Sequence, residues 1–289
     1  MSQLTANGIQ LEYEALGDAR NPTMVLIRGL GTQMVDWHPD LLEQLVQLGL
    51  HVVIFDNRDV GLSEKFDHAG VPSFKDVLLG TVPAPYTLSD MAADVVGLLD
   101  NLGIAKAHIL GISLGGMIAQ VLSAEYPARV ISLLSVMSTS GKPDLPGPTD
   151  AAVKAFNAPP AITEAAAIQQ TAEHKVVFGS PGYPESIEER IADATRSFHR
   201  SRNPDGPARQ RLAVASQSDR TALLSKLDLP TTVIHGVDDS LIPIACGENT
   251  AALISNATFV AVAGMGHNIP RLLVPEFVGL VKAHLDRVT

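Results

Sequence analysis

A serine in a glycine-flanked turn is the residue of this chain best suited to act as a nucleophile. Ser113 is the central residue of a Gly-x-Ser-x-Gly motif over residues 111–115. An apolar run precedes the motif at residues 108–110, and apolar residues recur after it at helical spacing until residue 122. The pattern predicts a strand, a sharp turn and a helix, with the serine at the turn. A hydroxyl held there is exposed and fixed in place, which nucleophilic attack requires.

The glycines around the serine support this interpretation. Gly111 and Gly115 lie two residues on either side of Ser113. We expect a side chain at either position to collide with the neighbouring strand or helix as the chain reverses. The helix after Ser113 would direct free N–H groups and its positive dipole end at the reacting centre, which favours a developing oxyanion. A glycine-rich turn without chemistry is the alternative, and the predicted strand and helix favour the nucleophile.

In this context the chain resembles the α/β-hydrolase fold family, in which a nucleophile, an acid and a histidine follow one another along the sequence. The resemblance implies a mostly parallel, twisted sheet with helices on both faces. It also implies that backbone N–H groups of Leu30 and Leu114 form the oxyanion hole, because Leu30 follows the first glycine after the strand predicted at residues 24–27. These hydrolases usually carry histidine where this chain has Arg28. We expect Arg28 to hold a neighbouring loop rather than to take part in catalysis.

The resemblance extends to an acid and a base. Asp238 and Asp239 both follow the strand predicted at residues 231–235, and the family pattern Gly-x-x-Asp-x-x-x-Pro selects Asp239. His267 lies on a glycine-rich loop after the last predicted strand, residues 258–262. Serine, aspartate and histidine therefore occur in the family's order. His235, at a strand end, is interpreted as a core histidine.

The remaining periodicity predicts the elements that position these residues. Asn7-Gly8 predicts a hairpin between strands at residues 2–6 and 9–15. The loop at residues 56–63 is similar to a family signature, with Asp59 in a usual glycine position, and we expect internal hydrogen bonds and an Arg–Asp pair to build it. Residues 66–85 are expected to be irregular. Further strands are expected at residues 52–55 and 130–137, and helices at residues 37–48, 87–102 and 274–288.

The composition changes after residue 141. Residues 142–228 lack strand-like runs and indicate helices at residues 149–157, 162–177, 186–202 and 207–217. The resemblance implies a cap (lid) domain over residues 142–228, inserted into a core domain of residues 1–141 and 229–289. The cap's basic residues are expected mostly on solvated helix faces, with an inward-facing arginine as a candidate for binding a substrate carboxylate; they are Arg196, His199, Arg200, Arg202, Arg209 and Arg211.

Composition narrows the class of protein. The chain has 289 residues, 46% of them hydrophobic, and a formal net charge of −10. The acidic balance and the absence of a basic run argue against nucleic acid or a membrane surface as a partner. No signal peptide or metal-ligand spacing is seen, so a cytoplasmic protein without metal or cofactor is expected. The single cysteine, Cys246, is expected to be a small buried residue. Monomer and homodimer both stay open.

Together these observations predict a serine hydrolase that cleaves a carboxylic ester of a small organic molecule through an acyl-enzyme. Within the family, the loops at residues 56–63 and 264–267 are similar to those of aclacinomycin methylesterase-type hydrolases, which cleave a methyl ester on a polyketide. Serine at position 113 argues against related enzymes that use a carboxylate nucleophile. Carbon–carbon bond hydrolysis, lactonase and perhydrolase chemistry stay open on the same triad, and a small-molecule receptor with this fold is a further alternative.

Overall fold

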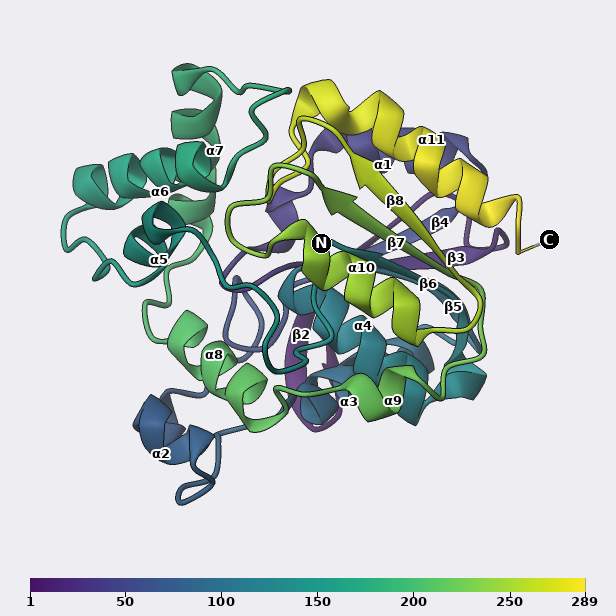
Figure 1. The fold of residues 1–289 in the computed structure, drawn as a ribbon, viewed down its shortest axis with the longest axis horizontal. Helices are drawn as coiled ribbons and strands as arrows, with labels where there is room; N and C mark the ends of the chain where they lie inside the picture. Colours follow the sequence, from purple (N-terminus) through teal and green to yellow (C-terminus); the bar gives the residue numbers. More distant parts are fainter. Residues whose placement is uncertain (289) are drawn as a thin grey trace.

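The computed structural model describes residues 1–288, and a sheet of eight strands runs through its centre (Figure 1). Along the sheet the strands follow the order β1-β2-β4-β3-β5-β6-β7-β8. The pairs β1–β2 and β2–β4 are antiparallel, and every later pair is parallel, which confirms the mostly parallel sheet. The strands span Ser2–Ala6 (β1), Ile9–Leu16 (β2), Thr23–Ile27 (β3), His51–Phe55 (β4), Ala107–Ile112 (β5), Val130–Val136 (β6), Thr231–Gly236 (β7) and Ala257–Val262 (β8).

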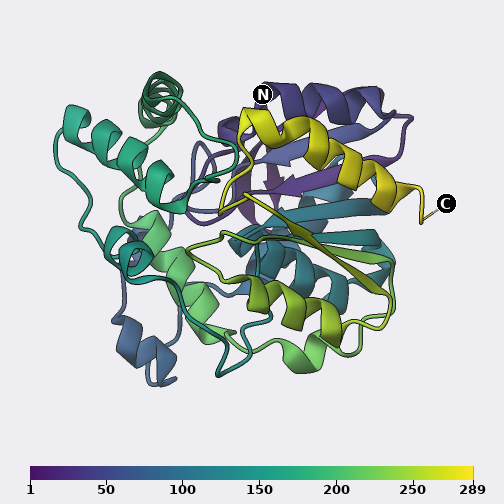
Figure 2. The same cartoon turned by 45° about the horizontal axis from the view of Figure 1, so that its top comes forward.

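Helices cover both faces of the sheet, as Figure 2 shows. In β3, Met24 and Leu26 belong to one cluster of buried side chains, and Val25 and Ile27 belong to the other. Because successive side chains of a strand point to opposite faces, a strand covered on both faces is apolar throughout. One face is covered by α1 (Pro39–Gln47) and α11 (Val274–Leu285), and the other by α3 (Leu88–Asn101), α4 (Leu114–Glu125) and α10 (Ile244–Leu253).

Capping residues determine where two of these helices begin. At α3 the Thr87 hydroxyl accepts the N–H of Asp90, and the Asp90 carboxylate accepts the N–H of Thr87. This reciprocal pair is a capping box and confirms the predicted start. Helix α1 begins at Pro39 instead of Trp37, because proline has the backbone angle of a first helical residue and needs no N–H acceptor there.

Other predicted elements were wrong in part. Residues 66–85 contain a short helix, α2 (Phe74–Leu78), capped by the Ser73 hydroxyl, where irregular chain was expected. The last helix ends at Leu285 and not at residue 288. Helix α10 was not predicted, because its glycine, asparagine and threonine have weak helical propensity and its apolar residues form no clear stripe.

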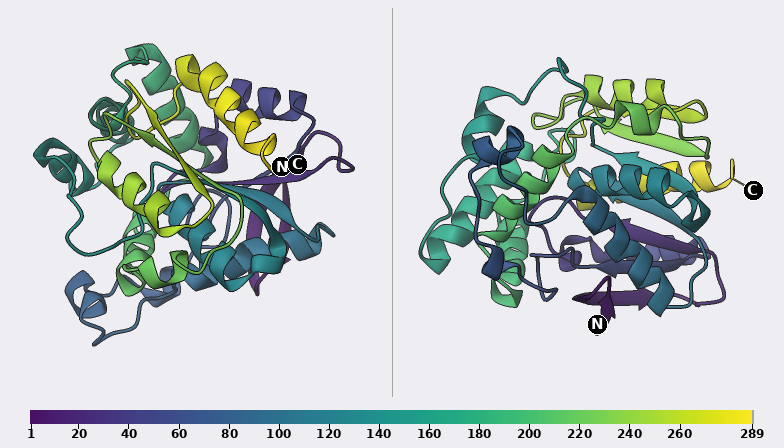
Figure 3. Two further views of the ribbon diagram at one scale, coloured as in Figure 1. Left: turned by 45° about the vertical axis from the view of Figure 1, so that its right-hand side comes forward. Right: turned by 90° about the horizontal axis from the view of Figure 1, so that it is seen from below.

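A helical segment, residues 142–228, connects β6 to β7 and lies over the carboxyl ends of the parallel strands (Figures 1 and 3). Four of its helices coincide closely with the predicted ranges, and a short fifth, α9, was not predicted. Helix α2 packs beside α8, so the excursion after β4 joins the same layer. The helices are α5 (Asp150–Phe156), α6 (Glu164–Phe178), α7 (Ile187–Arg200), α8 (Gly206–Ser216) and α9 (Thr221–Leu224).

Ion pairs join the helical segment to the loop after β4. Arg209 on α8 donates to both carboxylate oxygens of Asp59, each over 2.8 Å, and both side chains are buried. Arg200 on α7 pairs with Asp56 over 2.7 Å. Arg209 and Arg200 are therefore already bound to core carboxylates, and a third buried arginine of the segment, Arg220, donates to backbone carbonyls and to Gln120. This corrects the expectation that an inward-facing cap arginine is available for a substrate.

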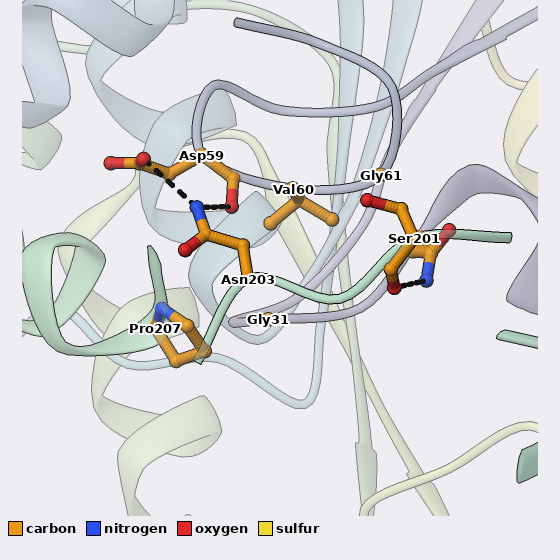
Figure 4. A pocket seen from close by; sticks show the side chains of 8 residues that line it. Gly31, Asp59, Val60, Gly61, Ser201, Asn203 and Pro207 are labelled. Atoms are coloured by element: carbon orange, nitrogen blue, oxygen red, sulfur yellow. Dashed lines mark hydrogen bonds between the residues drawn. The ribbon is translucent and has the colours of Figure 1, made fainter. Parts of the chain in front are cut away.

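The loop after β4 is also held by neutral contacts. The Asn203 amide donates to the backbone carbonyl of Asp59 over 3.0 Å and to its carboxylate over 3.2 Å (Figure 4). A small pocket of about 30 Å³ remains beside Gly31 and Pro207 at this junction. Arg58 pairs with Asp94 of α3, so the expected Arg–Asp pair reaches outside the loop.

Candidate active site

The turn between β5 and α4 presents the Ser113 side chain at the end of the sheet. Ser113 has φ 54° and ψ −120°, a conformation that a residue with a side chain rarely adopts. Its N–H donates to the carbonyl of Val136 over 2.9 Å, and its carbonyl accepts from the Ser138 hydroxyl over 2.8 Å. These bonds from β6 and its following loop hold the strained residue in place.

Both glycines of the motif are required by close backbone contacts. A Cβ at Gly111 would lie 2.1 Å from the carbonyl oxygen of Gly115. A Cβ at Gly115 would lie 2.1 Å from the carbonyl oxygen of Ile27 at the end of β3. Each distance is far below van der Waals contact, so the predicted reason for the glycines is confirmed. The first turn of α4 consequently packs directly on the end of β3.

The structure brings Ser113, Asp239 and His267 together. Nε2 of His267 lies 2.9 Å from Oγ of Ser113, and Nδ1 lies 2.7 Å from Oδ2 of Asp239. The other carboxylate oxygen of Asp239 accepts the N–H groups of Leu241 and Ile242 over 2.9 and 2.8 Å. This carboxylate is thus fixed by its own loop and aimed at the imidazole.

The neighbouring aspartate has a different position. Asp238 is exposed, and its carboxylate accepts the N–H of Gly264 over 2.9 Å. It therefore ties the loop after β7 to the loop that carries His267, without contacting the imidazole. Of the two adjacent aspartates, Asp239 is the one that the structure places beside the histidine.

A part of the helical segment that sequence analysis missed holds the histidine loop. The N–H of His267 donates to the carbonyl of Phe178 over 2.7 Å. The Ser180 hydroxyl accepts the N–H of Gly266 over 2.9 Å and donates to the side-chain oxygen of Asn268 over 2.6 Å. A Cβ at Gly266 would lie 2.1 Å from the carbonyl oxygen of Gly179. In the sequence, only glycines and a serine mark the two segments that meet here, the end of α6 and the loop that begins at residue 264. Hydrophobic periodicity does not predict a contact of this kind.

Two backbone N–H groups lie beside Ser113 without an acceptor. Within residues 1–288, neither Leu30 nor Leu114 donates its backbone N–H to another residue. A Cβ at Gly29 would lie 3.3 Å from Cβ of Ser113, so the chain leading to Leu30 passes directly over the serine. Leu114 is the first residue of α4, where N–H groups are free of helical partners. The residue after Gly29 and the residue after Ser113 therefore each have a backbone N–H without an acceptor in the described chain.

His235 lies next to the acid and is fully buried. Its Nε2–H donates to the carbonyl of Ile242 over 2.8 Å, and Nε2 lies 3.6 Å from Oδ2 of Asp239. Burial lowers the pKa of His235, with smaller opposing effects from Ile242 and Asp239, which keeps the imidazole neutral near pH 7. Nδ1 has no hydrogen-bond partner in the described chain. The prediction of a core histidine is confirmed, although one of its two nitrogens is unpaired.

Comparisons with known proteins define the class. The family model described as alpha/beta hydrolase fold matches residues 22–270. The chain therefore belongs to the α/β-hydrolase fold family, and the predicted fold class is confirmed. The enol-lactonase of Burkholderia xenovorans LB400 has the same fold, with a TM-score of 0.74 at 24% identity over 99% of this chain and 100% of that one.

Two relatives have similar sequences over nearly their whole length. RutD of Variovorax paradoxus, whose name assigns it to carbamate hydrolysis, is 28% identical over 91% of this chain and 92% of its own. The rhodomycin D methylesterase DnrP of Streptomyces peucetius is 24% identical over 99% of this chain and 98% of its own. The expected likeness to a methylesterase of this fold is confirmed. The protein is a hydrolase by family, and its relatives cleave different bonds.

Within residues 1–288, no helix is both long enough and apolar enough to cross a membrane. The single cysteine, Cys246, is buried at 4% exposure, as expected.

Proposed function

We propose that this protein hydrolyses a carboxylic ester of a small organic molecule, with Ser113 as the nucleophile. The observation that carries the proposal is the continuous hydrogen-bonded chain from Asp239 through His267 to Oγ of Ser113, with distances of 2.7 and 2.9 Å. A serine hydroxyl becomes a nucleophile when a base lies within hydrogen-bond distance and a third group orients that base. The methylesterase relative supports ester as the bond that is cleaved.

Each residue of the site has a role in the proposed reaction. His267 removes the proton from Ser113 as Oγ attacks the acyl carbonyl, and the oxyanion that forms accepts the N–H groups of Leu30 and Leu114. Asp239 fixes the tautomer with Nδ1 protonated and stabilises the imidazolium. His267 then protonates the departing alkoxide, which leaves as the alcohol.

The second half of the reaction uses the same groups. Water enters beside His267, which removes one of its protons as the oxygen attacks the acyl-enzyme. The same two N–H groups bind the second oxyanion, and collapse of this intermediate returns the proton to Ser113 and releases the acid. Apart from the ester and one water molecule, these steps use only side chains and backbone groups of this chain.

We further propose that the helical segment is the cap of this enzyme, over a core of residues 1–141 and 229–289. It lies over the end of the sheet that carries the reacting residues and contacts the histidine loop through Phe178 and Ser180. A cover in that position excludes water and shapes the space for the substrate.

Ester turnover by wild type and Ser113→Ala tests the proposed function. We expect wild type to hydrolyse p-nitrophenyl acetate or hexanoate. The turnover rate of the variant should be lower by about 10³-fold or more, because removal of the nucleophile from a serine triad has an effect of at least this size in other hydrolases. Circular dichroism and thermal unfolding would establish that both proteins fold equally. Equal turnover by the two proteins would contradict the proposal.

A further inference from the structure

An arginine lies beside the proposed nucleophile at the end of β3. Ile27 pairs with Gly111 in the sheet, so Arg28 and Gly29 run alongside the two residues that lead into the serine turn. A Cβ at Gly29 would lie 3.3 Å from Cβ of Ser113, and Arg28 is the residue before Gly29. The backbone of Arg28 therefore lies beside the turn that carries Ser113.

The guanidinium of Arg28 is only partly satisfied by the protein. Nε donates to the Thr32 hydroxyl over 3.2 Å, and Thr32 lies in the same loop after β3 and not in a neighbouring one. The guanidinium carbon lies 4.7 Å from the centre of the Trp37 ring, so the plane is held by stacking. Within the described chain, neither terminal nitrogen donates a hydrogen bond or pairs with a carboxylate.

The buried arginines of this protein differ in this respect from Arg28, which is half-buried. Arg58 and Arg209 each donate two or more bonds to a buried carboxylate. Arg220 donates to three backbone carbonyls and to the side chain of Gln120. Buried cations are normally paired in this way, because the loss of hydration is costly. Arg28 is half-buried, and its terminal edge has no partner in the described chain.

The two carboxylates whose charges act on Arg28 are hydrogen-bonded or paired with other residues. Asp36 accepts the N–H of Gln33 over 2.7 Å and a bond from the Ser197 hydroxyl. Asp193 pairs with Lys175 over 2.6 Å and with Arg196 over 2.9 Å. Burial lowers the pKa of Arg28, and the distant charges of Asp36 and Asp193 oppose this only in part. The guanidinium stays charged near pH 7 because its ordinary pKa is above 12.

We infer that the terminal Nη1 and Nη2 edge of Arg28 binds a carboxylate carried by the acyl part of the substrate. The preferred esters are then monoesters of dicarboxylic acids. A planar carboxylate matches two parallel N–H donors of a guanidinium. The acyl part is chosen because the leaving alcohol must face His267 to be protonated, whereas Arg28 lies on the strand that leads to Leu30. This inference rests on the proposed ester hydrolysis.

Matched pairs of methyl esters test the inference. Monomethyl succinate, glutarate and adipate vary the distance between carboxylate and ester, and each is compared with a neutral ester of the same shape, such as methyl 5-methylhexanoate for monomethyl glutarate. We expect wild type to give the higher kcat/KM on the charged member of at least one pair. Higher kcat/KM on the neutral member at every length would overturn the inference.

The variants Arg28→Met and Arg28→Lys separate charge from packing. We expect Arg28→Met to reduce kcat/KM on the preferred monoester by roughly tenfold to a hundredfold, as for loss of a charged hydrogen bond, and to change the neutral ester by less than about twofold. Arg28→Lys should retain part of the preference. Arg271→Met, which removes an exposed arginine at 65% side-chain exposure, is the control for net charge and should change neither ester. An equal loss on both esters with Arg28→Met would overturn the inference.

A second readout covers poor folding of the Arg28 variants and slow turnover of these esters. Glutarate should slow the labelling of Ser113 by a fluorophosphonate in wild type more than 5-methylhexanoate does, and equal protection would count against the inference. Absence of any label on Ser113 would contradict the proposed function instead. Labelling of Ser113 with no preference for charge would leave the proposed function intact and reject only the role of Arg28.

Discussion

The backbone N–H of His267 donates to the carbonyl of Phe178 over 2.7 Å. The proposed catalytic base is therefore held by the helical segment as well as by the loop on which it lies. Ser180 adds to this contact through its bonds with Gly266 and Asn268. The end of α6 thus supports the proposed catalytic histidine, and changes there should affect turnover without touching the substrate.

Ser180→Ala tests this support. The change removes the acceptor of the Gly266 N–H and the donor to Asn268, so we expect the histidine loop to move and kcat for ester hydrolysis to fall by roughly tenfold, at about 1.4 kcal/mol per tenfold. Ser186→Ala, which removes the cap of α7 away from the histidine, is the matched control and should lower stability more than kcat. Unchanged kcat in Ser180→Ala would show that the contact is dispensable.

The choice between the two adjacent aspartates gives a second prediction. Asp239→Asn replaces the carboxylate that contacts Nδ1 and favours the wrong tautomer of His267, so kcat should fall by about 10³-fold or more. Asp238→Asn leaves an oxygen for the Gly264 N–H and should cost less than about tenfold. Steady-state kinetics on one ester compares them. The opposite ranking would assign the acid to Asp238.

The buried pair of Arg209 and Asp59 should dominate the attachment of the helical segment. Burial alone would raise the pKa of Asp59, but the bonds from Arg209, from the N–H of Phe66 and from Tyr86 lower it, so the carboxylate stays ionised. Arg209→Met leaves this charge buried and uncompensated, and we expect a loss of about 3–5 kcal/mol in the free energy of unfolding.

A double variant distinguishes charge from packing at that pair. Asp59 has φ 69°, a left-handed conformation that glycine adopts without strain. Asp59→Gly in the Arg209→Met background removes the orphaned carboxylate and should recover part of the lost stability in urea unfolding. Arg202→Met, at an exposed position of the same segment, should change stability by less than about 0.5 kcal/mol. Further destabilisation in the double variant would contradict this account.

Acid should destabilise the protein through buried histidines. Nδ1 and Nε2 of His284 contact the hydroxyls of Thr232 and Ser132, and burial, with His108 and Arg287, lowers the pKa of His284 to about 4. The unfolded chain, with an ordinary pKa of 6.5, then binds the proton more tightly than the folded one. Stability from neutral His284 is therefore present above pH 6.5 and is lost as the pH falls toward 4.

The size of this effect is measurable. At about 1.4 kcal/mol per pH unit, the fall from 6.5 to about 4 corresponds to roughly 3 kcal/mol of the free energy of unfolding. Urea unfolding of wild type and His284→Gln between pH 7 and 4 should show a shallower decline in the variant. Parallel declines would mean that other groups, such as His108, carry the acid sensitivity.

Local patterns predicted the sheet well, and they identified the three residues that the structure brings together at the candidate site. Ser113 could be found because a strand, a turn and a helix leave a pattern within some 15 residues, and Asp239 and His267 each follow a strand. The support of His267 by Phe178 and Ser180 could not be predicted, because it joins two loops by backbone bonds. The pairing of Arg209 with Asp59 and the unpaired edge of Arg28 depend on which side chains meet, and periodicity cannot specify that.

Covalent labelling tests the central claim most directly. Intact-mass measurement after incubation with a fluorophosphonate should show a single adduct on wild type and none on Ser113→Ala, with peptide mapping to residue 113. The reagent reacts with a serine only when a base and an oxyanion hole activate it. An unlabelled wild type, or a Ser113→Ala variant that is labelled as fast as wild type, would contradict Ser113 as the nucleophile of this protein.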